Sequence, residues 1–340
     1  MSAAVASAVA GGSDADRAAL VLDGIVGAGG QGRIHRLAGG SGLLFKEYLD
    51  PAGVDAGALA DLVALRRALG ETERRALDHR TAWPLCRVVA EGRCAGFLMH
   101  AAPDTMRWRT AAGAFRLTEL QYLLHPVKPA TGGVVRPDPA QRLDLVRLTV
   151  HLIADLHRYG LVIGDLSQAN ILWTVAPEPA VFLLDCDGIR RAGAHPVLDQ
   201  ADTPDWGDPL SPYGSHATVD SDRYKAALVV GRVLAQDAYL APGAPLDLLP
   251  GILTDRQTAA VRRLWQQAAG AYGTRPDLAA WAGALDGRDV IRLPALAPPQ
   301  RRPVDESLFE RRSARGTIRL RPPRGRPGPG NPLAAPPPAP

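Results

Sequence analysis

One stretch decides the fold of this chain: Leu161-Val162-Ile163-Gly164-Asp165-Leu166-Ser167-Gln168-Ala169-Asn170-Ile171-Leu172. The segment before it has apolar residues at helical spacing, and Gly160 is a suitable C-terminal cap for such a helix. Asp165 and Asn170 then stand five residues apart, and a later apolar run, 182–184, ends in Asp185. Each feature alone has a structural explanation, because Asx-turns also favour Asp and Asn. Their joint order and spacing favour a functional site that contains Asp165, Asn170 and Asp185.

A glycine-rich segment lies far upstream, at Gly27-Ala28-Gly29-Gly30-Gln31-Gly32, and fits the pattern G-x-G-x-x-G. Glycine lets a backbone approach phosphate groups closely and adopt positive φ. The segment lies between two β-type runs, whereas a dinucleotide-binding version would open a helix. Lys46 follows in the apolar run 43–48, in a chain that has only two other lysines. The alternatives are an ordinary hairpin turn and a strand-end lysine that reaches solvent.

Taken together, these motifs resemble the protein kinase superfamily over about residues 20–287, most closely its atypical bacterial serine/threonine kinase-like proteins. The resemblance implies an α+β, two-lobed fold with a small β-rich N-lobe and a larger, mainly helical C-lobe. We expect a kinase-like domain at 18–290, with the N-lobe at about 18–99 and the C-lobe at about 100–290. Strands are expected at 20–26, 33–37, 43–48, 85–90 and 95–99, and helices at 55–69 and from 141 to 160.

The resemblance also implies a role for each site residue. Asp165 would orient the attacking hydroxyl and accept its proton, and Lys46 would hold the α- and β-phosphates of ATP. Asn170 and Asp185 would bind Mg²⁺. The other nucleotide-binding residues would come from the glycine-rich loop, the gatekeeper and the hinge: Gly27, Gly29, Gly32, Ile34, Met99, His100 and Ala101.

Several positions depart from the kinase pattern. Ile163-Gly164 replaces the His-Arg pair, so switching by a phosphate bound to that arginine is not expected. Ser167 replaces a lysine, which removes a positive charge near the transferred phosphate. Asp208-Pro209-Leu210 replaces A-P-E, so Arg275 is expected to pair with Asp208. Asp222 matches the aspartate that braces the catalytic loop.

Two acidic positions stay open. The helix glutamate that should pair with Lys46 is Glu73 or Glu71 when counted back from residues 83–84, but the count forward from Lys46 falls nearer Asp61. We favour Glu73. Asp187 occupies the glycine position of D-F-G. An extended chain would point it toward a second metal ion, whereas a turn would leave it in solvent or capping the turn.

Three functions fit these residues. The first is a serine/threonine protein kinase that transfers the γ-phosphate of ATP-Mg²⁺ to a hydroxyl group of a protein substrate. The second is a small-molecule kinase of the aminoglycoside or choline type, favoured by Asp187 and by the Gly-Asp-Leu form of the loop. The third is a weakly active, nucleotide-binding scaffold, suggested by Ser167 and by the uncertain helix glutamate. The sequence does not name the substrate.

Composition adds the setting. Residues 291–340 hold 13 of the 30 prolines, and ten arginines against three acidic residues. We therefore expect a disordered basic tail there. We expect this tail to recruit partners and not to bind nucleic acid. Residues 1–17 are Ala-rich, and we expect a disordered tail there too. Three cysteines without metal-ligand spacing favour a reduced, cytoplasmic setting. No apolar run reaches the ~20 residues that span a bilayer.

Overall fold

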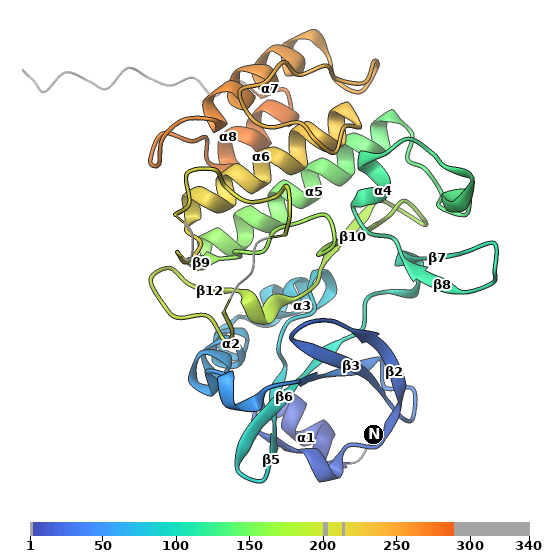
Figure 1. Cartoon of the computed structure of the whole chain (residues 1–340), viewed down its shortest axis with the longest axis vertical. Coiled ribbons are helices and arrows are strands. Elements are labelled where there is room, and N and C mark those ends of the chain that lie inside the picture. The colour runs from blue at the N-terminus through green and yellow to red at the C-terminus, as the bar shows by residue number, and fades with distance from the viewer. Residues whose placement is uncertain (1–2, 200–202, 213–214, 289–340) are drawn as a thin grey trace, which may run out of the picture. The chain divides into compact units, whose positions relative to one another are not determined.

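The structure is a computed structural model, and it describes residues 3–199, 203–212 and 215–288. This part of the chain is an α+β protein with a mixed six-stranded sheet and eight α-helices. The sheet is formed by the first hundred residues, and most of the helical residues follow it (Figure 1). The expected basic tail at 291–340 lies outside the described residues.

The sheet has the strand order β1-β5-β6-β4-β3-β2. Its strands are β1 (Ala15–Asp16), β2 (Leu22–Ala28), β3 (Gly32–Leu37), β4 (Leu43–Tyr48), β5 (Cys86–Ala90) and β6 (Arg93–His100). Strand β1 is parallel to β5, and the other neighbours are antiparallel. In the centre, Lys46 pairs with Ile34 on one side and with Phe97 on the other. Because side chains alternate along a strand, Phe45 and Lys46 point to opposite faces.

Helix α1 (Ala3–Gly11) covers the face of the sheet that carries Phe45. Val5 and Ala8 are buried there beside Phe45 and Leu98. Our expectation of a disordered tail at 1–17 is therefore wrong for the described residues. Alanine has the highest helix propensity, and burying the two side chains gives this short helix the packing that it needs.

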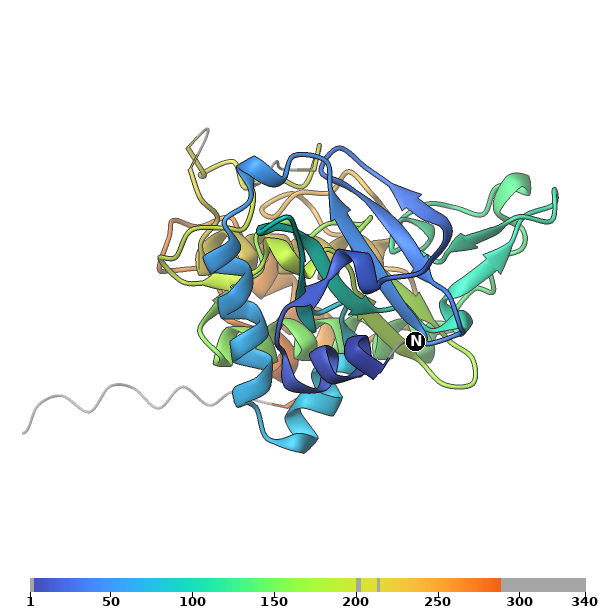
Figure 2. The same ribbon diagram turned by 90° about the horizontal axis from the view of Figure 1, so that it is seen from below.

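The opposite face of the sheet meets α2 (Ala56–Ala68) and α3 (Glu71–Arg80), and Figure 2 gives a second view of these layers. One buried cluster continues from this face, which includes Phe97, into the helical part, which includes Trp173 and Trp281. The helical part contains α4 (Gln121–Leu124), α5 (Pro139–Arg158), α6 (Val219–Ala235), α7 (Asp255–Ala268) and α8 (Leu278–Leu285). Helix α5 packs against α6 and α8.

Short strands line the helical part on the side toward the sheet. They are β7 (Arg107–Arg109), β8 (Phe115–Leu117), β9 (Leu161–Val162), β10 (Ile171–Thr174), β11 (Ala180–Leu183) and β12 (Arg190–Arg191). They form three two-stranded sheets, β7-β8, β9-β12 and β10-β11. None of the helices in the described ranges is long and apolar enough to cross a membrane.

The strands and helices expected from the sequence are present, with ends shifted by at most three residues. Strand β4 has the predicted bounds, and α2 begins one residue after the expected start. Asp55 caps α2 by accepting hydrogen bonds from two backbone N–H groups. Gly160 follows α5 with φ +72°, the left-handed conformation that ends many helices.

Candidate functional site

A cavity of about 760 Å³ is lined by residues of the sheet and of the helical part. Ten of the eleven predicted site residues line it: Gly27, Gly29, Gly32, Ile34, Lys46, Met99, His100, Asp165, Asn170 and Asp185. The eleventh, Ala101, donates its N–H to the carbonyl of Gly42 at 2.8 Å, and Ala102 lines the cavity instead. Residues more than a hundred positions apart in sequence thus share one cavity.

The glycine-rich turn joins β2 to β3 and lines this cavity. The N–H of Gly29 donates to the carbonyl of Gly32 at 2.9 Å, which closes the turn. A Cβ atom at Gly32 would lie 2.6 Å from the carbonyl oxygen of Glu47, so only glycine fits there. No heavy atom lies within 4 Å of where a Cβ of Gly29 or Gly30 would stand. The backbone of this turn is therefore open to a ligand.

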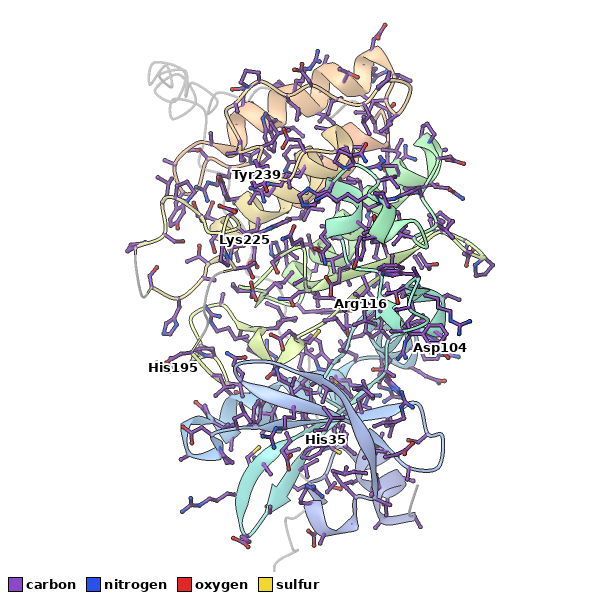
Figure 3. The ribbon with its side chains drawn as sticks, turned by 45° about the vertical axis from the view of Figure 1, so that its right-hand side comes forward. His35, Asp104, Arg116, His195, Lys225 and Tyr239 are labelled. Carbon is purple, nitrogen blue, oxygen red and sulfur yellow. The ribbon has the colours of Figure 1, made fainter. Side chains whose placement is uncertain are left out.

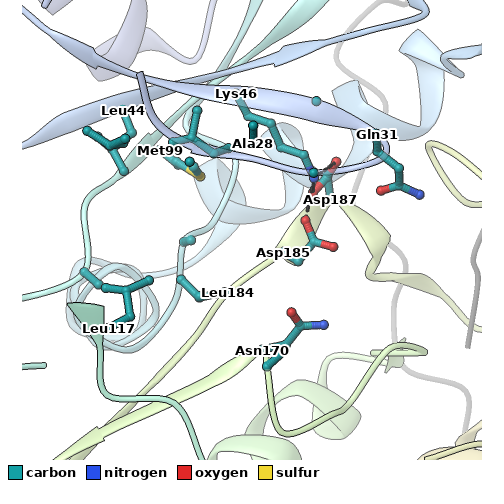
Figure 4. A pocket seen from close by; sticks show the side chains of 18 of the residues that line it. Ala28, Gln31, Leu44, Lys46, Met99, Leu117, Asn170, Leu184, Asp185 and Asp187 are labelled. Carbon is teal, nitrogen blue, oxygen red and sulfur yellow. Dashed lines mark hydrogen bonds and ion pairs between the residues drawn. The ribbon is translucent and has the colours of Figure 1, made fainter. Parts of the chain in front are cut away.

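Apolar side chains form a slot at one end of the cavity. Leu44 and Met99 lie on one side of the slot, and Leu117 and Leu184 lie on the other (Figure 4). Such a slot suits a flat, largely apolar group such as a nucleotide base. Leu117 belongs to β8, so part of this wall comes from a segment to which we assigned no role from the sequence.

Lys46 lies deeper in the cavity and is 5 % exposed. Its Nζ donates to Asp185 Oδ1 at 2.5 Å and to the two carboxylate oxygens of Asp187 at 2.7 and 2.9 Å. Figure 4 shows both carboxylates beside the ammonium group. Burial alone would lower the pKa of Lys46, but the charges and hydrogen bonds of Asp187 and Asp185 raise it overall. Lys46 is therefore a charged cation.

Within the described ranges, the carboxylates that contact Lys46 are those of Asp185 and Asp187, and no helix glutamate is its partner. Glu73 accepts a hydrogen bond from the backbone N–H of Gly70, at the start of α3. Glu71 lies near Arg75 on the exposed face of the same helix, and Asp61 is exposed on α2. Our preference for Glu73 is therefore wrong. Counting residues could not reveal this, because the partner comes from another part of the chain.

The position of the Asp187 side chain also differs from both alternatives that the sequence left open, which were a second metal site and an exposed or capping position. The chain turns at Cys186–Gly188 in a short 3₁₀ helix, and Asp185 before it has φ +55°. This turn directs Asp187 inward, where it is 3 % exposed and accepts a hydrogen bond from the Tyr48 hydroxyl at 3.0 Å. A positive φ at a residue other than glycine is uncommon and often marks a functional site.

The loop around Asp165 is held by hydrogen bonds on both carboxylate oxygens. The Thr203 hydroxyl donates to Oδ1 at 2.9 Å, and Asn170 Nδ2 donates to Oδ2 at 2.9 Å. Burial raises the pKa of Asp165 above its ordinary value, although these hydrogen bonds and the charge of Lys225 act in the opposite direction. A raised pKa at a carboxylate in a cavity is typical of a general base.

Helix α6 fixes the backbone of the same loop. Asp222, fully buried, accepts hydrogen bonds from the N–H groups of Ile163 and Gly164 at 2.7 and 2.9 Å and lies 3.1 Å from His157 Nε2. Lys225 Nζ donates to the carbonyl of Gly164 at 2.7 Å. The expected role of Asp222 is confirmed. The role of Lys225 was missed, although a lysine inside an apolar helix face of an arginine-rich chain was a usable signal.

Among the described residues that line the cavity, Asn170 and Asp185 have an oxygen atom that could bind a cation. Because Nδ2 of Asn170 donates to Asp165, its amide oxygen is the atom left to bind a ligand. The side chain of Asp185 is 39 % exposed. Among the described residues there is no group of three or more acidic, histidine or cysteine side chains that could hold a metal. Two donors still fit Mg²⁺ when phosphates and waters complete its octahedron.

Ser167 is not at the cavity. Its side chain is fully buried, and its hydroxyl has no hydrogen-bond partner within the described ranges. The serine itself is thus buried, and the loss of a positive charge near the transferred phosphate stays a prediction. A neighbour two residues from Asp165 need not share its surroundings once the loop turns.

The β7–β8 hairpin supplies a wall of the cavity that sequence reasoning missed. Arg107, Phe115, Arg116 and Leu117 all line the cavity, and Phe115 is 70 % exposed. Figure 3 shows Arg116 on this hairpin, between the helices and the sheet. Each strand has only three residues, which is too short for an alternating pattern to stand out.

Asp208 and Arg275 form a buried, bidentate ion pair, as the sequence predicted. The guanidinium NH1 and NH2 atoms lie 2.6 and 2.8 Å from the two carboxylate oxygens, and the side chains are 1 % and 0 % exposed. The guanidinium also lies over the rings of Tyr224 and Tyr272. The pair fixes the end of the segment that carries Thr203.

We expect Arg275→Met to destabilise the fold by about 3–5 kcal/mol, because it leaves the charge of Asp208 buried without a partner. Urea unfolding measures this loss. The matched control is Arg288→Met at an exposed ion pair, where we expect at most about 1 kcal/mol. Equal unfolding midpoints for the two variants would contradict the expectation.

The same pair has a defined pH dependence. Burial would raise the pKa of Asp208, but the hydrogen bonds from Arg275 and Leu210 lower it overall. A lowered pKa in the folded state means that the pair stabilises fully above the ordinary aspartate pKa of about 4. This stabilisation is lost as the pH falls below that value.

Comparison with known proteins gives no family for this chain: no protein-family model matches it, and no curated protein is significantly similar in sequence.

Proposed function

We propose that this protein is an ATP-dependent phosphotransferase of the protein kinase type, which transfers the γ-phosphate of ATP-Mg²⁺ to a serine or threonine hydroxyl. One observation supports this most strongly. Lys46 contacts Asp185, 139 residues later in the chain, inside the cavity that Asp165, Asn170 and the glycine-rich turn also line. These are the parts that phosphoryl transfer requires, in the order in which a kinase carries them.

Each residue has a defined task in this proposal. Asp165, held by Thr203 and Asn170, orients the acceptor hydroxyl and takes its proton. The open backbone of the glycine-rich turn covers the phosphates. Lys46 donates to phosphate oxygens, and Asn170 and Asp185 hold Mg²⁺. When bound, the ion neutralises the charge that develops on the transferred phosphate.

Two features favour a protein acceptor over a small molecule. The Thr203 hydroxyl contacts Asp165 directly, and the segment that follows is fixed by Asp208 and Arg275, so it can serve as a platform for a peptide. Asp187, which suggested a small-molecule kinase from the sequence, contacts Lys46 instead. Lys46 also has a carboxylate partner, which weakens the case for an inactive scaffold.

Nucleotide binding in the apolar slot tests the first half of the proposal. Calorimetric titration with ADP and excess Mg²⁺ should give saturable binding. We expect Leu117→Asp to weaken this binding by more than about tenfold, because it places a charge against the base. The control Val127→Asp adds the same charge at an exposed residue outside the cavity and should bind like the wild type. No binding by the wild type, or equal binding by both variants, would contradict the proposal.

A further inference from the structure

The two carboxylates that contact Lys46 have different surroundings. Asp187 is almost fully buried, and its side chain is 3 % exposed, whereas that of Asp185 is 39 % exposed. Both oxygens of Asp187 accept from Lys46, and one of them also accepts from Tyr48, which is itself buried. Asp185 contributes one oxygen to Lys46. Only Asp185 is therefore accessible enough to change partners at low cost.

A count of donors shows what a phosphate would require. An ammonium group has three N–H donors. Lys46 makes three hydrogen bonds, one to Asp185 and two to Asp187. A phosphate oxygen can accept from Lys46 only when one of these bonds is released. Releasing the hydrogen bonds between Lys46 and Asp187 would leave a buried carboxylate without its cation, which is costly. If Asp185 is released instead, water or a metal ion can bind its more exposed carboxylate.

We propose that Asp187 and Tyr48 permanently position Lys46, and that Asp185 alternates between Lys46 and the metal ion. Asp187 thereby does the work that a helix glutamate does in the proteins that this chain resembles. When Asp185 turns to the metal, one N–H of Lys46 becomes available for phosphate. This inference rests on the proposed function for its nucleotide, but the Asp187–Lys46 pairing is independent of it.

The position of Asp187 has a consequence for regulation. Asp187 lies two residues from Asp185 on the same turn, so the partner of Lys46 and the metal ligand are set by one segment. The positions of helices α2 and α3 therefore do not determine which carboxylate contacts Lys46. Rotation of a helix that removes a glutamate from the lysine, a switch available to a kinase with a helix partner, is thus not available to this chain.

A double-mutant cycle on ADP affinity at saturating Mg²⁺ tests the positioning role. We expect Asp187→Asn and Lys46→Met each to weaken ADP binding about tenfold, and the double variant to bind no more weakly than Lys46→Met alone. The milder Tyr48→Phe should weaken it by about threefold. Glu73→Gln, which alters the partner favoured from the sequence, should bind like the wild type.

A direct metal-binding role for Asp187 would give a different cycle. Asp187→Asn would then weaken ADP binding equally in the Lys46→Met background, and the proposal would be overturned. Weaker ADP binding by Glu73→Gln than by Asp187→Asn would overturn it as well. Failure of the wild type to bind ADP would instead reject the proposed function.

Thermal stability tests the pairing without any nucleotide. Lys46→Met leaves the carboxylate of Asp187 buried without a cation, with only the hydrogen bond from Tyr48, so we expect a lower melting temperature than in the wild type. Adding Asp187→Asn should restore part of the loss. Adding Asp185→Asn should restore little, because the more exposed Asp185 can be hydrated. Equal restoration by the two second-site changes would overturn the distinction between a fixed and an exchanging carboxylate.

Discussion

The variant Asp165→Asn is expected to lose phosphate transfer by about 10²–10⁴-fold, the range that general-base catalysis contributes. Asparagine has nearly the same shape, and its amide oxygen can still accept from Thr203; the bond from Asn170 Nδ2 to the side chain is lost, but its bond to the backbone carbonyl of residue 165 is kept. The loop should remain in place, because Asp222 and Lys225 hold its backbone and not its side chain. Binding of Mg²⁺-ADP should therefore stay within about twofold of the wild type.

Initial rates at saturating ATP measure this effect, and calorimetry measures ADP affinity. Asp144→Asn is the matched control, because it makes the same chemical change on α5 outside the cavity. Burial raises the pKa of Asp165, so the acidic limb of kcat/KM should lie above the ordinary aspartate pKa of about 4. Turnover near the wild-type rate in Asp165→Asn would remove this residue from the proposed role.

The variant Asp185→Ala is expected to lose turnover by more than about 10³-fold, because the cavity would keep only Asn170 as a direct metal ligand. ADP binding without Mg²⁺ should be unchanged or tighter, since Lys46 would keep Asp187 and gain a free N–H. Both expectations have one reason: Asp185 would bind the metal, and it competes with phosphate for the N–H groups of Lys46.

Rates and ADP titrations with and without Mg²⁺ check both halves of this prediction. Asp144→Ala again controls for loss of a carboxylate elsewhere. Wild-type turnover of Asp185→Ala at millimolar Mg²⁺ would show that another residue holds the metal. Weaker ADP binding in the absence of Mg²⁺ would show that Asp185 binds the nucleotide by another route.

The sequence predicted those parts of the molecule that local patterns determine. The β-type run 43–48, with three apolar residues in succession at its start, determines β4, which has its predicted bounds, and Gly160 follows α5 where a left-handed residue is needed. Ten of the residues that line the cavity were predicted too, because the motifs that the chain shares with the kinase pattern include them, whereas the β7–β8 wall was missed. Arg275 was expected to pair with Asp208 because the resemblance places Leu210 at the usual glutamate position, and this ion pair is present.

Other parts depend on contacts between distant segments. Whether Asp187 faces solvent or Lys46 is decided by the positive φ of Asp185 and by the space beside Tyr48, and neither is encoded within a few residues. Helix α1 forms because the sheet offers Val5 a buried position. Ser167 lies two residues from Asp165 and yet is fully buried outside the cavity. Tertiary packing decides all of these cases.

The most direct test of the central proposal is transfer of ³²P from γ-labelled ATP in the presence of Mg²⁺. The full chain is incubated alone, with serine- and threonine-containing peptides, and with aminoglycosides and choline, and labelled products are separated by class. We predict label on a serine or threonine hydroxyl, absent from Asp165→Asn and Asp185→Ala. Label on a small molecule alone would contradict the protein acceptor, and absence of label from every acceptor, although the protein binds ADP, would contradict the phosphotransferase.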